Sequence, residues 1–333
     1  MKKFLCLFLV LSMSLGLFAA CGSAPETPET PATPETSVPV QTEATEGVKD
    51  TVNPYYTEDP AADDTINILM IGNSFCYYYA DELVGMAAAN GIKLRVSNVY
   101  YSGCSLTQHY TWWKNGERNY HFITHDENGR TEIEGADLEY CLKQGNWDMI
   151  SLQQGGTDTT GGKTVEEALE QSRAIRTELW DYIKGRFPMS KYYWHHTWSY
   201  QIGYNRNGTQ YTEVSQQHNR DQFMSTWAKR ICNEDGLIRI PSGEAWRRVR
   251  DGGYDNLCAR MAINGGEGDY YHDGDVGGGQ YLNACVWFER VLGQNCIGNT
   301  FRPDYNLSED MIAMLQQAAH DTVALLKADE EGM

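Results

Sequence analysis

From about residue 65 to residue 328, short apolar runs alternate with longer amphipathic ones. This alternation restricts the possible folds more than any other feature of the sequence. The short runs have the length and composition of buried strands, and the longer ones have helical periodicity. Strands that alternate with helices predict a parallel sheet covered by helices on both faces. The five strand candidates are INILMI (66–71), LRVSNVYY (94–101), WDMISLQ (147–153), KYYWHHTW (191–198) and GLIRIP (236–241).

Local signals support the helices between these strands. Thr164 and Glu167 have the spacing of a capping box at the start of one helical stretch. Gly91 follows another stretch, at a position where a C′ glycine is favoured. The predicted helices span 75–90, 164–187, 216–234, 279–292 and 308–327. Ligands of such sheets bind beyond the carboxyl ends of the strands, so functional residues are expected there.

The connection after the second strand, about 104–146, is too long for an ordinary crossover. It contains Asn128-Gly129 between alternating stretches, and this dipeptide favours a two-residue hairpin turn. We predict an inserted β-hairpin that projects over the ligand-binding end of the sheet. A helix or turn is expected after it, around residues 138–143.

The N-terminal residues have the layout of an export signal. Lys2 and Lys3 precede an apolar run (4–18) that is too short to span a bilayer, and small residues lead to Cys21. The LFAAC sequence resembles the lipobox of bacterial lipoproteins, which implies a signal peptide over 1–20 and a lipid anchor on Cys21. We therefore expect a protein held at the bacterial cell surface by that lipid. The alternative is an ordinary secreted protein with an incidental cysteine.

Residues 21–64 are predicted to form a disordered linker behind the anchor. Pro, Thr, Glu and Ala dominate this segment, which cannot bury enough apolar surface to offset its ordering entropy. It carries ten acidic residues against one lysine, and so supplies half of the chain's net charge of −18. The acidity argues against nucleic-acid binding and does not identify a substrate.

Seven cysteines remain in the predicted domain (65–328), and none is spaced as CxxC. A zinc framework is therefore not expected, and an odd number leaves at least one free thiol or an intermolecular bond. Several lie in apolar surroundings and are predicted to be small core residues. The DGD sequence at 273–275 lacks the other ligands of a calcium loop. We predict no metal and no cofactor.

Ser74 lies just past the first strand candidate, at the start of a predicted helix. Unpaired N–H groups at a helix start can stabilise an oxyanion beside such a hydroxyl. The same position also favours a serine that only caps the helix. A serine becomes a nucleophile only when a base reaches it. Of the eight histidines, His272 is the best candidate, because it lies in a glycine-rich loop three residues after Asp269.

Taken together, these segments resemble SGNH (GDSL-like) hydrolases. ILMIGNSF, the glycine in VYYSGCSL, the polar SLQQGG and the late DxxH follow the block order of that family. IGNSF is similar to the first block of an uncharacterised bacterial lipoprotein branch. The resemblance covers about 66–326 and implies a three-layer α/β/α, flavodoxin-like SGNH fold. Such a fold has a central parallel sheet, here of about five strands with an inserted β-hairpin.

The resemblance also assigns roles to residues. It implies that Ser74 is the nucleophile, His272 the base and Asp269 the carboxylate that orients the base. The N–H groups of Ser74 and Gly103 would form the oxyanion hole together with a side-chain amide. Asp273 is an alternative to Asp269, because it is adjacent to His272.

The sequence departs from the family at two positions. No GxND block follows the third strand, so the amide of the oxyanion hole falls to Gln153 or, second, to Gln154. Asn73 stands where the GDS block has an aspartate. Aromatic rings near a catalytic loop can stack on sugars, although the same rings can equally be core residues. The predicted substrate-binding residues are Asn73, Gln154, Trp112, Trp113, His196 and Trp198.

The sequence thus predicts a surface-anchored serine esterase that removes acetyl or other short acyl groups from carbohydrate, or acts on another small ester. One alternative is a non-catalytic carbohydrate-binding lipoprotein with the same fold, suggested by the altered GDS block and the missing GxND block. Another is a lipase or thioesterase, which would prefer long acyl chains.

Overall fold

β1 (Thr65–Gly72) lies at the centre of the sheet and is buried on both faces. The structure, a computed structural model, describes residues 64–155, 163–203, 205–206, 209–210, 212–259 and 274–332. Ile68 and Met70 pack into one hydrophobic core, and Leu69 and Ile71 pack into a second core across the sheet. A strand covered on both sides requires such a continuous apolar run, because successive side chains point to opposite faces.

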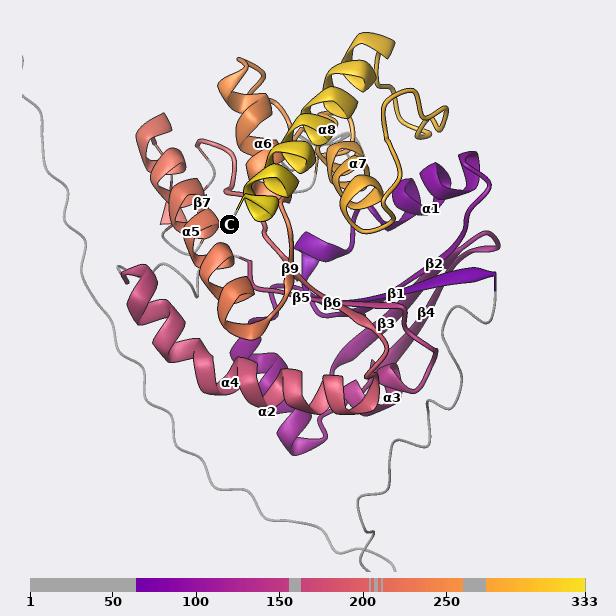
Figure 1. Cartoon of the computed structure of the whole chain (residues 1–333), viewed down its shortest axis with the longest axis vertical. Coiled ribbons are helices and arrows are strands. Elements are labelled where there is room, and N and C mark those ends of the chain that lie inside the picture. The colour runs from indigo at the N-terminus through magenta and orange to yellow at the C-terminus, as the bar shows by residue number, and fades with distance from the viewer. Residues whose placement is uncertain are drawn as a thin grey trace, which may run out of the picture. The chain divides into compact units, whose positions relative to one another are not determined.

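The main sheet has seven strands in the order β4-β3-β2-β1-β5-β6-β9 (Figure 1). Its five parallel strands, β2, β1, β5, β6 and β9, are joined in the order of a flavodoxin-like sheet. The prediction of a parallel sheet of five strands is confirmed. Besides β1, the strands are β2 (Lys93–Tyr100), β3 (Tyr120–Asp126), β4 (Gly129–Ala136), β5 (Met149–Gln153), β6 (Lys191–His195) and β9 (Ile238–Ile240), with β7 (Asn205–Arg206) and β8 (Thr209–Gln210) paired separately.

Helices cover both faces of this sheet, as predicted. One layer contains α1, α6, α7 and α8, and the other contains α2, α3, α4 and α5 (Figure 1). The helices are η2 (Ser74–Cys76, a 3-10 turn), α1 (Ala80–Ala89), α2 (Leu106–Asn115), α3 (Leu138–Leu142), α4 (Val165–Arg186), α5 (Val214–Asp235), α6 (Ser242–Asp251), α7 (Gly279–Arg290) and α8 (Glu309–Glu331). No helix of the described residues is both long and apolar enough to cross a membrane.

The inserted hairpin is present, but its predicted position was wrong. β3 pairs antiparallel with β2 and β4 pairs with β3, so the hairpin extends the sheet instead of projecting over its ligand-binding end. Pairing satisfies the backbone N–H and C=O groups that β2 would otherwise present as an edge strand. The turn also lies one residue earlier than predicted, because Asp126 pairs with Gly129 and the two turn residues are Glu127 and Asn128.

Several local predictions are confirmed, and two helices were missed. Gly91 has a φ of +72°, and Thr164 forms a capping box with Glu167 at the start of α4. α3 falls in the predicted 138–143 segment. The seven cysteines are all buried thiols, in agreement with a core role. The sequence analysis did not predict α2 or α6.

Candidate active site

Ser74 lies directly beyond the carboxyl end of β1. Asn73 has an extended backbone and caps η2, in which Ser74 is the first residue and is half-buried. The predicted continuous helix from residue 75 is not formed, because η2 is a single turn and α1 starts only at Ala80. A helix dipole requires many aligned peptide units. Any stabilisation of an anion at Ser74 therefore depends on individual N–H groups.

The side chain of Asn73 connects three segments at this end of the sheet. Its Oδ1 accepts hydrogen bonds from the backbone N–H of Phe75 (3.1 Å) and from Gln153 Nε2 (2.7 Å). Its Nδ2 donates to the carbonyl oxygen of Cys104 (2.9 Å). A side-chain amide meets these contacts, because it accepts at its oxygen and donates at its nitrogen. Asn73 therefore fixes the Ser74 turn against the loop that carries Gly103.

Gln153 comes from the end of β5 and is 1% exposed. Because Asn73 Oδ1 already accepts from Phe75, it requires a donor from Gln153, and this fixes which end of the Gln153 amide faces it. A Cβ at Gly72 would lie 2.4 Å from Gln153 Nε2, so glycine is needed at the end of β1 for steric reasons. Gln153 Oε1 has no hydrogen-bond partner among the described residues.

Gln154 has a different role from Gln153. Its Oε1 accepts from the backbone N–H of Leu106 (2.5 Å), and its Nε2 donates to the carbonyl of Gly155 (3.2 Å). Gln154 is buried, and these bonds hold the first turn of α2 against the end of β5. Both polar atoms of the Gln154 amide are thus bonded to backbone groups, and its predicted role in substrate binding stays a prediction. Of the two amides considered for an oxyanion hole, the geometry favours Gln153.

Gly103 lies in the exposed loop after β2, with a φ of +67°. A Cβ there would meet no atom within 4 Å, so the requirement for glycine is conformational and not steric. The loop is joined to the end of β1 through the Tyr101 N–H, which donates to the carbonyl of Gly72 (3.4 Å). The Asn73–Cys104 bond adds a second link, next to Gly103 in the chain.

Asn98 also supports the Ser74 turn and was missed by the sequence analysis. It lies in β2, fully buried, and its Nδ2 donates to the carbonyl of Cys76 (2.6 Å), the last residue of η2. The signal was a polar amide in an otherwise buried strand, because such groups are rarely buried without a specific partner. Cys76 is buried beneath the turn, and this burial raises the pKa of its thiol to about 12.

His196 and Trp198, predicted to contact substrate, are core residues in this structure. They are 1% and 4% exposed, and Trp198 stacks on Trp246 with ring centroids 4.6 Å apart. The burial of His196 lowers the pKa of its imidazole to about 3. The neighbouring His195 contacts Ser242 Oγ (2.9 Å) and is a packed, hydrogen-bonded histidine.

The same aromatic contacts connect Ser74 to the start of α7. Phe75, the residue after Ser74, meets Trp198 edge to face at 4.9 Å, and Trp198 stacks on Trp246. The Trp246 ring in turn lies against Gly279, where a Cβ would be 2.5 Å from the indole. Two segments far apart in the sequence are therefore packed through one row of rings.

Trp112 and Trp113 lie on α2 and line a surface pocket of about 410 Å³ between α2, α3 and α4. Trp113 packs on Tyr182 (4.4 Å between centroids), in the last two turns of α4, which precede the amino end of β6. Trp112 meets Tyr101 edge to face at 4.9 Å, and Tyr101 belongs to the Gly103 loop.

The remaining predicted site residues lie outside the described residues. These are the base His272, the carboxylates Asp269 and Asp273, and the lipidation site Cys21. Their roles stay predictions. The described residues on either side of 260–273 are joined by a hydrogen bond from the Gly277 N–H to the Ala259 carbonyl (2.9 Å), just before α7.

The strand order and the serine turn after β1 define a flavodoxin-like α/β protein with a polar site at the carboxyl ends of its parallel strands. The chain belongs to the family described as a domain of unknown function, DUF4886, which matches residues 67–322. A DUF4886 family protein from Bacteroides uniformis has a similar structure, with 28% sequence identity and a TM-score of 0.67. The match covers 80% of this chain and 96% of that one.

Two more distant structures are also similar to this chain. One is described as a putative GDSL-like lipase from Parabacteroides merdae, with 16% identity and a TM-score of 0.43 over 69% of this chain and 96% of that one. The other is a carbohydrate esterase family 3 protein from Talaromyces cellulolyticus, with 9% identity and a TM-score of 0.41 over 68% and 97%. No curated protein has a sequence significantly similar to this chain.

Proposed function

We propose that this protein is a serine ester hydrolase with Ser74 as its nucleophile. The observation that supports this most strongly is the Asn73 side chain, which holds the Ser74 turn and the Gly103 loop together through buried hydrogen bonds. In the proposal, the N–H groups of Ser74 and Gly103 bind the oxyanion, and the Gln153 amide adds a third donor. Donors fixed in advance lower the barrier because they do not reorganise as negative charge develops.

The reaction proceeds through an acyl-enzyme. Ser74 Oγ attacks the ester carbonyl while His272 takes the serine proton, and His272 then gives that proton to the oxygen of the leaving alcohol. Asp269 orients His272, with Asp273 as the alternative. A water molecule next attacks the acyl-enzyme and gives one proton to His272. As the bond between Ser74 Oγ and the acyl carbon breaks, His272 returns that proton to Ser74 Oγ and the carboxylic acid leaves.

We further propose that the acyl group is short and that the alcohol is a carbohydrate at the bacterial cell surface. The LFAAC sequence supports a lipid on Cys21, and the linker behind it would let the domain reach nearby polysaccharide. Trp112, beside Tyr101 of the Gly103 loop, is the ring in the predicted set best placed to meet a sugar.

Hydrolysis of p-nitrophenyl acetate by wild type, Ser74→Ala and His272→Ala tests the mechanism. Each variant should lose activity by about a thousandfold or more, because the nucleophile and its base act as a unit. Ser215→Ala, an exposed serine on α5, is the matched control and should behave as wild type. A serine-reactive fluorophosphonate should label wild type but not Ser74→Ala. Normal turnover in both site variants would exclude this nucleophile and base.

The role of Gln153 is tested by Gln153→Glu, which keeps the size of the side chain but removes both N–H donors. Loss of one oxyanion donor lowers kcat by about a hundredfold or more. Gln154→Glu should lower kcat less, because its carboxylate can still accept the hydrogen bond from the Leu106 N–H. Equal losses in the two variants would contradict the assignment of the third donor.

The substrate class is tested with acetylated glycans and with esters of increasing acyl length. Faster turnover of acetylated glycan than of octanoyl ester supports the proposal. A preference for long chains would indicate a lipase or thioesterase instead. Glycan binding without fluorophosphonate labelling would indicate a non-catalytic carbohydrate-binding protein.

A further inference from the structure

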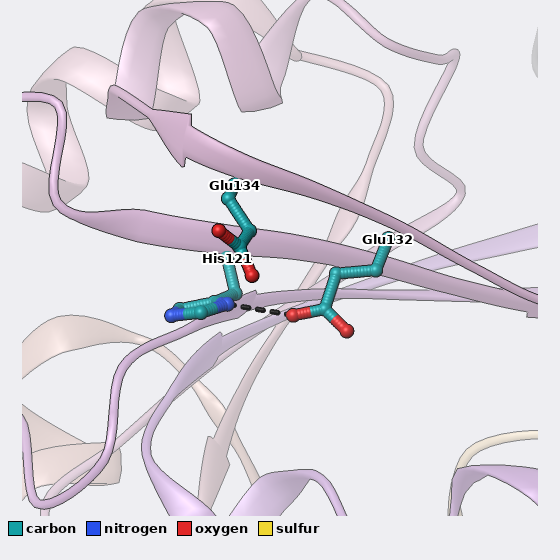
Figure 2. A group of neighbouring side chains, drawn as sticks. All are labelled: His121, Glu132 and Glu134. Atoms are coloured by element: carbon teal, nitrogen blue, oxygen red, sulfur yellow. Dashed lines mark hydrogen bonds and ion pairs between the residues drawn. The ribbon is translucent and has the colours of Figure 1, made fainter.

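One imidazole and two carboxylates meet on the exposed face of the inserted hairpin. They belong to His121 of β3 and to Glu132 and Glu134 of β4 (Figure 2). One ligand atom from each residue lies within 4.8 Å of the other two, and His121 Nδ1 is 2.6 Å from Glu132 Oε1. This is the one group of three or more potential metal ligands that meets this distance limit among the described residues.

The strand pairing explains why these three side chains converge. Glu132 and Glu134 are two residues apart on β4, so both point to the same face. Between the Tyr120–Ala136 and Phe122–Ile133 pairs, β3 has one residue, His121, whereas β4 has two, Glu134 and Gly135, so the extra residue lies on β4. A β-bulge re-aims the side chain that it carries. Here the bulge on β4 carries Glu134, whose carboxylate lies near the side chains of His121 and Glu132 (Figure 2).

The cluster also carries the charge that a cation requires. Glu132 and Glu134 each bring a carboxyl group to the cluster. Arg130 pairs with the Oε2 atom of Glu132, whereas His121 contacts Oε1. The oxygen that faces His121 is therefore the one that an ion would share with the imidazole.

We propose that His121, Glu132 and Glu134 form a binding site for a first-row divalent metal ion, with Zn²⁺ as the best match. Imidazole nitrogen together with carboxylate oxygen suits zinc, whereas oxygen-only sites suit magnesium and calcium. Three protein ligands leave a fourth position for water. Bonds of about 2.1 Å at tetrahedral angles place neighbouring ligand atoms about 3.4 Å apart. The 2.6 Å contact between His121 and Glu132 must therefore lengthen by about 0.8 Å, which the flexible glutamate side chain permits.

The ion would join β3 to β4 at the edge of the sheet. His121 lies beside Tyr100 (6.1 Å between ring centroids), and Tyr100 stacks on Tyr77 at 4.8 Å. Tyr77 caps η2, the turn that begins with Ser74. The proposed metal site is thus connected to the Ser74 turn by a row of aromatic rings, and it does not depend on the proposed esterase function.

Isothermal titration with ZnCl2 tests the site, on purified protein stripped of metal and free of any histidine tag. Wild type should bind one Zn²⁺ per chain with a micromolar Kd. Glu134→Gln and His121→Asn should each weaken binding by at least tenfold. Glu127→Gln is the matched control, because Glu127 is an exposed glutamate in the turn of the same hairpin and is outside the cluster.

A second readout is thermal unfolding with and without Zn²⁺. Because a ligand that binds only the folded state stabilises it, Zn²⁺ should raise the Tm of wild type and of Glu127→Gln, but not that of Glu134→Gln. Glu134 is exposed, so its substitution does not endanger folding. Undiminished zinc binding by Glu134→Gln, or no binding by wild type at 1 mM ZnCl2, would overturn the proposal. In either case the charged side chains of the cluster would serve only to protect β4, an edge strand, from pairing with another chain.

Discussion

Replacing Asn73 by aspartate changes one donor at the point where the site is joined together. Asn73→Asp keeps the shape of the side chain and restores the residue that the GDS block of SGNH hydrolases carries. The carboxylate can still accept from the Phe75 N–H and from Gln153 Nε2. It cannot donate to the Cys104 carbonyl, so two oxygen atoms would face each other at 2.9 Å.

The expected cost follows from these contacts. An unsatisfied buried acceptor costs about 1–3 kcal/mol, and burying a charge in a site that is 2% exposed adds to this. Stronger charge-assisted bonds from Phe75 and Gln153 offset part of the loss. We expect Asn73→Asp to lower the free energy of unfolding by about 3 kcal/mol at pH 8, roughly a hundredfold in the folded-to-unfolded ratio.

The pH dependence gives the decisive test. A cost of about 3 kcal/mol corresponds to a pKa raised by about two units above 3.9, to about 6 for the new carboxyl. A carboxyl with a raised folded-state pKa destabilises above that pKa and ceases to do so as pH falls towards the unfolded value. The protonated acid can also donate to Cys104. The loss in free energy of unfolding of Asn73→Asp relative to wild type should therefore become smaller as the pH falls from about 6 to about 4.

Urea unfolding followed by tryptophan fluorescence at pH 4.5 and pH 8 measures this difference. Asn128→Asp, at an exposed asparagine in the hairpin turn, controls for the added charge. If Asn73→Asp is as stable as wild type at pH 8, or if its deficit is the same at both pH values, the assigned hydrogen bonds are incorrect.

Three further predictions follow from other contacts. Gly72→Ala should lower stability by about 1–3 kcal/mol, because the new Cβ would lie 2.4 Å from Gln153 Nε2; an unchanged urea midpoint would contradict this. Burial raises the pKa of Glu82 to about 7 from 4.5, so wild type should lose about 3 kcal/mol relative to Glu82→Gln between pH 4.5 and pH 8. Parallel stability curves for those two proteins would refute that pKa. The seven thiols of the domain are buried, so Ellman's reagent should react with them only after denaturation; rapid labelling of native protein would argue against this packing.

The central fold could be predicted because its signals are local. Each parallel strand is a short apolar run, and residues such as Thr164 and Gly91 mark helix ends by their own chemistry. The same kind of signal was present for the missed helix α2, which has a Ser105–Gln108 capping box and ends at Gly116 with a φ of +63°. The expectation of a hairpin across the whole insertion obscured it.

The position of the hairpin and the details of the site depend on contacts between distant residues. No local pattern indicates that β3 pairs with β2, since that pairing is selected by the unpaired edge of β2. The different roles of Gln153 and Gln154 depend on Asn73 and Leu106, which are 80 and 48 residues away in the chain. The proposed metal ligands are likewise brought together by strand pairing, so the sequence analysis predicted no metal.

The antiparallel hairpin also explains how an insertion can be accommodated without rerouting the chain. β2 ends at the carboxyl edge of the sheet, β3 starts there beside Tyr100, and β4 returns to the same edge at Ala136. Two added strands thus bring the chain back to the carboxyl edge of the sheet, where β2 ended. α3 then leads on to β5. A single added strand would have left the chain at the opposite edge. The five parallel strands therefore keep the connections of a sheet without an insertion, and the hairpin can vary in sequence and length while the Ser74 turn stays in place.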